Sequence, residues 1–269
     1  MQNDRLFYGH EYIRTLKESY PALCEGSSLN KIDENFHIGV VEMWSRFPFV
    51  GRDPQNRFQA LGERDFAMQR NAWTTGADPS LQGMQRMGAS STYKGLAHLK
   101  PPCDLVLYSS LLWELQPITV IEFGSFQGGG ALWFADQIES QGIPGEVHSF
   151  EYFIKCVHPT ATHPRLHFHE ADLRALDTLD RSLFTRLPHP WLVVDDAHAN
   201  VEQLLRFLGE YLKSGDYVVV EDIMLKPTAG MIAEWVELTN ELSLLVDTKY
   251  TDAFGYNVTC SPNSWFRKI

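Results

Sequence analysis

Apolar residues recur along this chain in two patterns, namely short continuous runs and longer stretches with helical spacing. Continuous runs rich in β-branched residues are typical of buried parallel strands, and three of them end in acidic residues, over residues 118–122, 191–196 and 217–222. Two shorter strands are expected at residues 146–150 and 165–169, and acids follow them as well. Helical spacing fills segments around them, at residues 104–115, 131–138, 201–213 and 229–242. Strands that alternate with helices predict a parallel sheet covered by helices.

Two further strands are expected near the end of the chain, at residues 243–247 and 256–260. A late pair with a short connection must be antiparallel. The pattern therefore predicts an α/β, Rossmann-like fold with a seven-stranded, mostly parallel sheet and an antiparallel last strand. We place this core at residues 92–269.

Residues 1–91 are expected to form an N-terminal helical and lid-like extension. Helical patterns cover residues 4–20 and 36–47, and each of them stops before a proline. Residues 51–91 are polar and lack periodicity, which indicates an irregular segment of a length that is uncommon unless it is functional. Its methionines can line a substrate pocket or simply pack a short helix; they are Met68, Met84 and Met87.

A glycine-rich turn follows the first buried strand. Gly124 and Gly128 lack side chains, so the backbone can turn sharply there and a ligand can approach it closely. The spacing differs from the dinucleotide pattern Gly-x-Gly-x-x-Gly. With Glu122 before it and Ser125 within it, the turn resembles the first motif of S-adenosylmethionine (SAM) methyltransferases, which makes these four residues candidates for cofactor binding. An ordinary strand–turn–helix of another α/β protein is the alternative.

Acidic residues stand at the end of every expected parallel strand. In open α/β sheets the ligand binds beyond the carboxyl ends of the strands, so these side chains should line one crevice. Glu151 follows the second strand, where it can accept hydrogen bonds from ribose hydroxyls. Asp172 follows the third strand and should lie near the adenine edge. For both residues the alternative is a solvated surface acid or a helix cap.

A denser group of acids follows the fourth and fifth parallel strands. The segment Asp195-Asp196-Ala197-His198 and the pair Glu221-Asp222 should meet, because these strands should be neighbours. Two carboxylates about 4 Å apart repel by about 4 kcal/mol at an effective dielectric constant near 20, so the group needs protons or a bridging cation. Oxygen ligands with one histidine nearby favour Mg²⁺, with Mn²⁺ or Ca²⁺ as alternatives, over zinc.

The same group of residues can activate a hydroxyl. A dication held there can chelate a substrate oxygen and lower the pKa of its hydroxyl. His198 lies three residues after Asp195 and can then act as the general base. The alternative is a histidine that caps the next helix beside solvated acids. Four further histidines lie close together in the chain, namely His158, His163, His167 and His169. His167 and His169 would point to one face of a strand, where a two-histidine metal pair is the alternative, but no third ligand follows at a telling spacing and the four are interpreted as structural.

Composition narrows the classes of partner. The net charge of −11 argues against a nucleic-acid surface, which needs clustered lysine and arginine. The chain shows neither an apolar signal-peptide region nor an apolar run of membrane-spanning length. Four scattered cysteines indicate free thiols in a reducing cytoplasm; they are Cys24, Cys103, Cys156 and Cys260. We therefore expect a cytoplasmic protein that binds neither nucleic acid nor membrane.

Four segments together resemble the cephalosporin hydroxylase/rhamnosyl O-methyltransferase family. They are Tyr93-Lys94-Gly95, then residues 100–108 with the sequence Lys-Pro-Pro-Cys-Asp-Leu-Val-Leu-Tyr, then residues 194–198, and then residues 215–222. Between the second and third of them, Pro117 and Ile121-Glu122-Phe123-Gly124 add to the resemblance. The similarity covers about residues 92–225. It implies a class I methyltransferase fold, SAM and Mg²⁺ as cofactors, and a symmetric homo-oligomer.

The resemblance also implies roles for particular residues. Asp195, Glu221 and Asp222 would hold the metal. His198 would be the base, as in related macrolide-sugar O-methyltransferases, whereas catechol-type enzymes have a lysine in that place. The chain departs from the family where Glu151 replaces an aspartate, and the acidic doublet leaves open whether Asp195 or Asp196 is the ligand.

The expected function is Mg²⁺-dependent transfer of a methyl group from SAM to a hydroxyl of a small-molecule natural product, with the substrate chosen by residues 1–91. One alternative is a SAM-binding accessory protein that partners a tailoring oxygenase. A nicotinamide-dependent oxidoreductase is a further alternative, against which the absence of the dinucleotide glycine pattern counts.

Overall fold

A computed structural model describes residues 57–64, 90–197, 199, 201–223 and 232–269 of the chain. The chain divides into two compact units, Met1–Phe49 and Val50–Ile269, and all described residues belong to the second unit. The expected helices at residues 4–20 and 36–47 lie outside the described residues, and so do most of residues 51–91.

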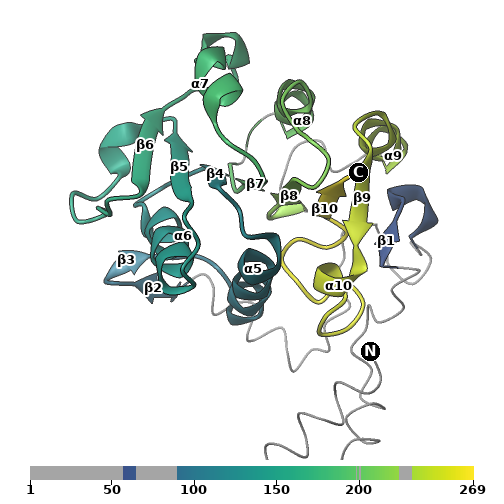
Figure 1. The fold of residues 1–269 in the computed structure, drawn as a ribbon, viewed down its shortest axis with the longest axis horizontal. Helices are drawn as coiled ribbons and strands as arrows, with labels where there is room; N and C mark the ends of the chain where they lie inside the picture. Colours follow the sequence, from purple (N-terminus) through teal and green to yellow (C-terminus); the bar gives the residue numbers. More distant parts are fainter. Residues whose placement is uncertain (1–56, 65–89, 198, 200, 224–231) are drawn as a thin grey trace, which may run out of the picture. The chain divides into compact units, whose positions relative to one another are not determined.

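The described residues form an eight-stranded sheet in the order β1-β9-β10-β8-β7-β4-β5-β6 (Figure 1). Its strands are β1 (Phe58–Gln59), β4 (Thr119–Phe123), β5 (Glu146–Glu151), β6 (Leu166–Glu170), β7 (Trp191–Asp195), β8 (Tyr217–Val220), β9 (Leu244–Asp247) and β10 (Trp265–Lys268). The pairs β4–β5, β5–β6, β4–β7 and β7–β8 are parallel. The last strand, β10, runs antiparallel to both β8 and β9. The predicted Rossmann-like, mostly parallel sheet with an antiparallel last strand is therefore confirmed.

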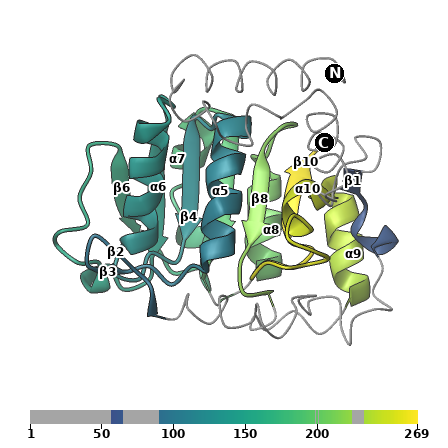
Figure 2. The same cartoon turned by 90° about the horizontal axis from the view of Figure 1, so that it is seen from below.

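Helices cover both faces of the sheet (Figures 1 and 2). One layer contains α5 (Pro102–Leu115), α6 (Gly129–Ser140) and the short α10 (Thr248–Thr251). The other contains α7 (Arg181–Arg186), α8 (Val201–Gly209) and α9 (Ile232–Glu241). Within the described residues, single turns of 3₁₀ helix also occur at η2 (Leu61–Glu63), η4 (Ile154–Cys156) and η5 (Leu176–Thr178).

The core consists of two apolar layers separated by the sheet. Alternate residues of β4 point to opposite faces, so Ile121 packs toward α8 and α9 while Val120 packs toward α5 and α6. Every residue of β4 and β7 is buried, which explains why both read as continuous apolar runs in the sequence. Burial of each large apolar side chain contributes about 1.5–3 kcal/mol, and this fixes the register of the central strands.

The glycine-rich turn joins β4 to α6. Gly124 has φ +97°, and a Cβ there would lie 2.9 Å from the backbone of Asp196. Gly129 starts α6, and a Cβ there would lie 2.1 Å from the carbonyl oxygen of Ala97. Ala97 belongs to a small hairpin of β2 (Thr92–Tyr93) and β3 (Leu96–Ala97). The glycines therefore let two backbone segments pack directly against the turn.

Two expectations differ from the structure. Residues 256–260 are turns rather than a strand, and the last strand is β10. Asn257, within this segment, has a φ value of +57°, which an extended strand does not allow, and its side chain accepts a hydrogen bond from the backbone of Asn263 at 3.0 Å. In addition, Phe58–Gln59 pairs with β9 as an eighth strand, in a stretch that we expected to be irregular.

Other expectations concern the surroundings of the protein. None of the helices in the described part of the chain combines the length and apolarity needed to cross a membrane. Three of the four cysteines lie within the described residues, and all three are free thiols, namely Cys103, Cys156 and Cys260.

Candidate active site

The candidate site lies at the carboxyl ends of β4, β5, β7 and β8. Asp195 pairs with Val220, and the backbone amide of Glu221 donates to the carbonyl oxygen of Asp195 at 2.9 Å. The amide of Asp196 donates to the carbonyl oxygen of Phe123 at 2.9 Å. These register contacts place the Asp195-Asp196 and Glu221-Asp222 pairs side by side, as the order of the strands predicted.

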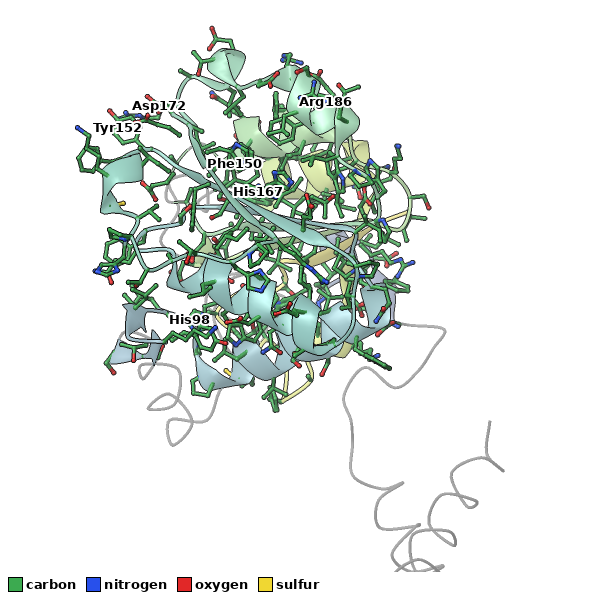
Figure 3. All side chains as sticks on the ribbon, turned by 60° about the vertical axis from the view of Figure 1, so that its left-hand side comes forward. His98, Phe150, Tyr152, His167, Asp172 and Arg186 are labelled. Carbon is green, nitrogen blue, oxygen red and sulfur yellow. The ribbon has the colours of Figure 1, made fainter. Side chains whose placement is uncertain are left out.

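A cavity of about 540 Å³ opens beside these strand ends. This volume is within the usual range for a small-molecule site. Four predicted cofactor or metal residues line it, namely Gly124, Glu151, Asp172 and Asp222. Asp196, the second residue of the acidic doublet, also lines it. Figure 3 shows Tyr152 and Asp172 together at this end of the strands, with His167 further along.

The carboxylate of Glu151 is fixed by the turn that follows β4. One oxygen accepts the backbone amide of Phe126 at 2.9 Å, and the other accepts that of Phe153 at 3.1 Å. Both oxygens keep free lone pairs because a carboxylate can accept about four hydrogen bonds. This arrangement is compatible with contacts to a diol.

Asp172 has a partner that the sequence analysis did not foresee. Arg174 donates to it from Nε at 2.8 Å and from Nη2 at 3.0 Å. These hydrogen bonds from Arg174 lower the pKa of Asp172. The guanidinium of Arg174 also lies 4.4 Å from the ring centroid of Tyr152. Tyr152 and Arg174 both line the cavity, so an aromatic ring and a cation lie beside Asp172 there.

The other predicted cofactor residues lie beneath the cavity wall. Ser149 donates to Glu122 at 2.5 Å and lies 2.6 Å from the hydroxyl of Ser125. Glu122 is 1% exposed and Ser125 is 4% exposed. A Cβ on Gly128 would lie 2.7 Å from that of Ala161. These residues therefore shape the turn from within the protein.

Lys100 is the main site residue that sequence reasoning missed. Its ammonium lies 2.8 and 2.7 Å from the two carboxylate oxygens of Glu221 and 3.2 Å from Asp196. Tyr108 donates to the same Glu221 carboxylate at 2.5 Å. The side chain of Lys100 is only 2% exposed. A lysine directly before Pro101-Pro102 and an apolar helix was the available signal, but one lysine says nothing about which acids it meets.

The acid–lysine cluster, defined as Lys100, Glu122, Asp196 and Glu221, places three carboxyl groups around one lysine. Burial by itself lowers the pKa of Lys100, but the carboxylates of Asp196, Glu221 and Glu122 outweigh it and raise that pKa above its ordinary value. Burial raises the pKa of Glu122 to about 7, although Lys100 and Ser149 act in the opposite direction. For Asp196 burial also raises the pKa, and the carboxylates of Glu221 and Asp222 add to this.

The donor set fits a hard dication in its chemistry. Asp195, Glu221 and Asp222 offer only oxygen ligands, which Mg²⁺ prefers, and one buried ammonium leaves the surrounding acids partly uncompensated. Asp195 is fully buried, with one carboxylate oxygen accepting the amide of Ala197 at 3.2 Å. Glu221 already binds Lys100 and Tyr108, so a dication there would share that carboxylate with Lys100 or displace it.

His198, the predicted general base, lies outside the described residues. Its neighbours Ala197 and Ala199 line the cavity.

The order of strands, the antiparallel β10 and the cavity at the carboxyl ends define a class I, Rossmann-like methyltransferase fold. Residues 85–269 match the family model described as Rhamnosyl O-methyltransferase/CmcI. The chain belongs to this family, and the resemblance predicted from the sequence is confirmed.

Curated relatives are similar over part of their length. A rhamnosyl O-methyltransferase of Mycobacterium leprae is 35% identical over 138 residues, covering 49% of this chain and 60% of that protein. The rhamnosyl O-methyltransferase of Mycobacterium tuberculosis H37Rv is 32% identical over 140 residues, covering 49% of this chain and 56% of that protein. The matches thus span 60% or less of these relatives.

Solved structures show the same fold. The apo structure of CmcI-N160 has a TM-score of 0.60 and 25% identity, covering 67% of this chain and 77% of that one. The structure described as cmcI-D160 Mg-SAM has a TM-score of 0.57 and 23% identity, covering 77% of this chain and 96% of that one.

Proposed function

We propose that this protein is a SAM-dependent, Mg²⁺-dependent O-methyltransferase that acts on a hydroxyl of a small-molecule natural product. The observation that carries the proposal is the group of acids from β7 and β8 beside a cavity of about 540 Å³. Membership of the Rhamnosyl O-methyltransferase/CmcI family supports it, as does the similarity to a structure described as holding Mg and SAM.

SAM would bind along the carboxyl ends of β4, β5 and β6. Glu151 would accept the ribose hydroxyls, because its carboxylate is already oriented by two backbone amides. Asp172 would lie near the adenine edge, beside Arg174 and Tyr152. Glu122 at the end of β4, and the turn containing Gly124, Ser125 and Gly128, would support the cofactor from below, with Asp195 at the far side.

Asp195, Glu221 and Asp222 would hold the metal. A bound Mg²⁺ supplies charge neutralisation and lowers the pKa of a nearby substrate hydroxyl. The protein's own part is to orient the acceptor oxygen in line with the methyl–sulfur bond, which replaces a bimolecular encounter with a positioned one. His198 would accept the hydroxyl proton as the oxygen–carbon bond forms and the carbon–sulfur bond breaks, leaving S-adenosylhomocysteine.

The names of the mycobacterial relatives favour a sugar hydroxyl, such as that of a rhamnosyl group, as the first substrate class to try. Residues 1–91 would select the substrate and residues 92–269 would form most of the catalytic core, whose sheet Phe58–Gln59 joins as an edge strand. We further propose a cytoplasmic homo-oligomer that binds neither nucleic acid nor membrane.

Methyl transfer from SAM to rhamnosyl and other hydroxylated acceptors, with Mg²⁺ or with EDTA, tests the proposal. We expect the wild-type protein to transfer methyl groups and EDTA to abolish this activity. Asp195→Ala should lose most of the activity, and the activity that remains should no longer depend on Mg²⁺. Normal kinetics in Asp195→Ala would exclude the metal role of this residue.

Calorimetry distinguishes the remaining alternatives. We expect binding of SAM and no binding of NADH. Binding of NADH in place of SAM would identify an oxidoreductase. Binding of SAM without turnover on any acceptor would favour an accessory protein that partners an oxygenase.

A further inference from the structure

Three metal-ligating side chains meet at the amino ends of β5 and β6, at the opposite end of these strands from the cavity. His148 of β5 pairs in register with His167 of β6. Glu146 lies two residues before His148 and therefore on the same face of the sheet. A carboxylate oxygen of Glu146 lies 3.8 Å from Nε2 of His148 and 3.4 Å from Nε2 of His167. The three ligand atoms all lie within 4.8 Å of one another.

These separations suit a tetrahedral transition metal. Zinc binds imidazole nitrogen at about 2.0–2.1 Å and carboxylate oxygen at about 2.0–2.2 Å, so two ligand atoms on one ion are about 3.4 Å apart. Small rotations of Glu146, whose side chain is 57% exposed, would bring the 3.8 Å separation to this value. Two imidazoles and one carboxylate leave a fourth position for water.

The hydrogen bonding of the two imidazole rings also favours a metal site. Nε2 of His167 is buried and forms no hydrogen bond within the described part of the chain. Nδ1 of His148 lies 3.0 Å from Nε2 of His169. If His148 donates its Nδ1–H to His169, its Nε2 lone pair faces Glu146, and such an outer hydrogen bond is the usual way in which a metal-binding histidine is oriented.

We propose that Glu146, His148 and His167 form a binding site for a zinc-type, first-row transition-metal dication, separate from the Mg²⁺ site. Imidazole ligands favour zinc, copper or nickel over magnesium. Burial, with the adjacent His169 and His167, lowers the pKa of His148 to about 4. His169 acts as a positioning residue through its contact with His148.

The ion would cross-link the two outer parallel strands. Glu151 ends β5, three residues beyond His148, and β6 leads into Asp172, so both strands carry predicted cofactor ligands at their other end. At about 3.3 Å per residue, the metal would lie about 10 Å from the cofactor side of the sheet. The ion would thus have a structural role, holding β5 and β6 together below the part of the cavity where adenosine would bind.

A neighbouring group provides an internal contrast. His163 lies 3.1 Å from Glu139 and 3.9 Å from Asp136. The carboxylate of Asp136, however, is already bound by Lys94 at 2.6 Å and by Tyr93 at 2.8 Å. One imidazole beside a neutralised acid makes a poor metal site, so His163→Ala is a matched control.

The test is a titration of the full-length protein, free of any polyhistidine tag, with ZnCl₂ in buffer containing excess Mg²⁺ and a phosphine reductant. We expect one saturable equivalent by calorimetry and a rise in Tm. His167→Ala should lower the zinc affinity by more than the about 10- to 100-fold expected for His169→Ala, which removes only an outer partner. The affinity of His163→Ala should equal that of the wild type. Cobalt(II) should give the intense visible absorption of a four-coordinate site.

Three results would overturn the proposal. They are the absence of saturable zinc binding, an unchanged affinity in His167→Ala, and displacement of the zinc by Mg²⁺. The side chain of His167 is 41% exposed, so its variant should fold, and an unchanged Tm without zinc verifies this. Because the readout is zinc binding, failure here leaves the proposed methyl transfer untouched, and failure of methyl transfer leaves this site untouched.

Discussion

The two ends of the parallel strands gather ionisable groups in contrasting ways. At the carboxyl ends, the acid–lysine cluster holds three carboxylates around one buried ammonium. At the amino ends, the histidine cluster, defined as Glu146, His148, His167 and His169, stacks imidazoles face to face, with 4.9 Å between the rings of His148 and His167. In the first cluster a buried lysine is held between carboxyl groups, whereas in the second burial lowers the pKa values of His148 and His169.

The contrast shows how burial decides which groups a protein can place together. A buried charge costs several kcal/mol unless another charge and hydrogen bonds compensate it. Lys100 therefore depends on Glu221 and Asp196, and they on it. A neutral imidazole needs no such partner, so the histidine cluster can be altered one residue at a time.

The largest expected effect is on catalysis. His198→Ala should lower the rate of methyl transfer by about 10²–10⁴-fold, the usual contribution of a general base, while SAM affinity by calorimetry stays unchanged. His163→Ala, which removes an imidazole near the amino end of β6, is the control and should turn over normally. An undiminished rate in His198→Ala would make that histidine structural.

Next comes the buried ammonium. Lys100→Met should lower the free energy of unfolding by about 3–5 kcal/mol, because it leaves Glu221 buried without its cation. Urea denaturation in EDTA measures this, and added Mg²⁺ should restore part of the loss. Lys94→Met is the control. It removes a 55% exposed partner of Asp136 and should cost no more than about 1 kcal/mol. Equal losses in the two variants would show that the cluster is not charge-coupled.

A smaller effect concerns pH. Burial raises the pKa of Asp104 from its ordinary 3.8 to about 7. The folded state therefore binds this proton more tightly than the unfolded state does. The stability that the proton contributes is complete below pH 3.8 and is lost as the pH rises through 7. Asp104→Asn should flatten this decline in urea midpoints between pH 4 and 7.

Asp180→Asn is a suitable control for the pH series. Asp180 caps α7 through Ser182, and its pKa is lowered from 3.8, so its titration falls below this pH range. Asparagine also caps helices well. If the urea midpoint of Asp104→Asn falls with pH as steeply as that of the wild type, the carboxyl group of Asp104 does not titrate in this range.

The smallest effect is expected in the histidine cluster without metal. His167→Gln should change the free energy of unfolding by no more than about 0.5 kcal/mol in EDTA, as for most surface substitutions. Urea denaturation of this variant beside Lys100→Met compares the two clusters directly. A loss of several kcal/mol would show that the imidazoles are bound into the core as tightly as the lysine.

Much of the sheet could be predicted because its signals are local. The apolar runs of β4 and β7 are buried on both faces and needed no tertiary information. The last strand was misplaced because residues 256–260 look apolar enough for a strand, while the left-handed conformations of Asn257 and Asn263 depend on contacts with the rest of the chain. The short β1 was missed because two residues carry no measurable periodicity.

For the candidate site too, local features could be predicted from the sequence and long-range contacts could not. By itself, the sequence determined that acids stand at the carboxyl ends of parallel strands, because an acid directly after an apolar run is a pattern of neighbouring residues. Only the tertiary structure decided that Lys100 would bind the carboxylates of Glu221 and Asp196. It also decided that Glu146, His148 and His167 would meet at the amino ends of β5 and β6. Such encounters depend on strand order and register, which join residues far apart in the chain and leave no periodic trace within it.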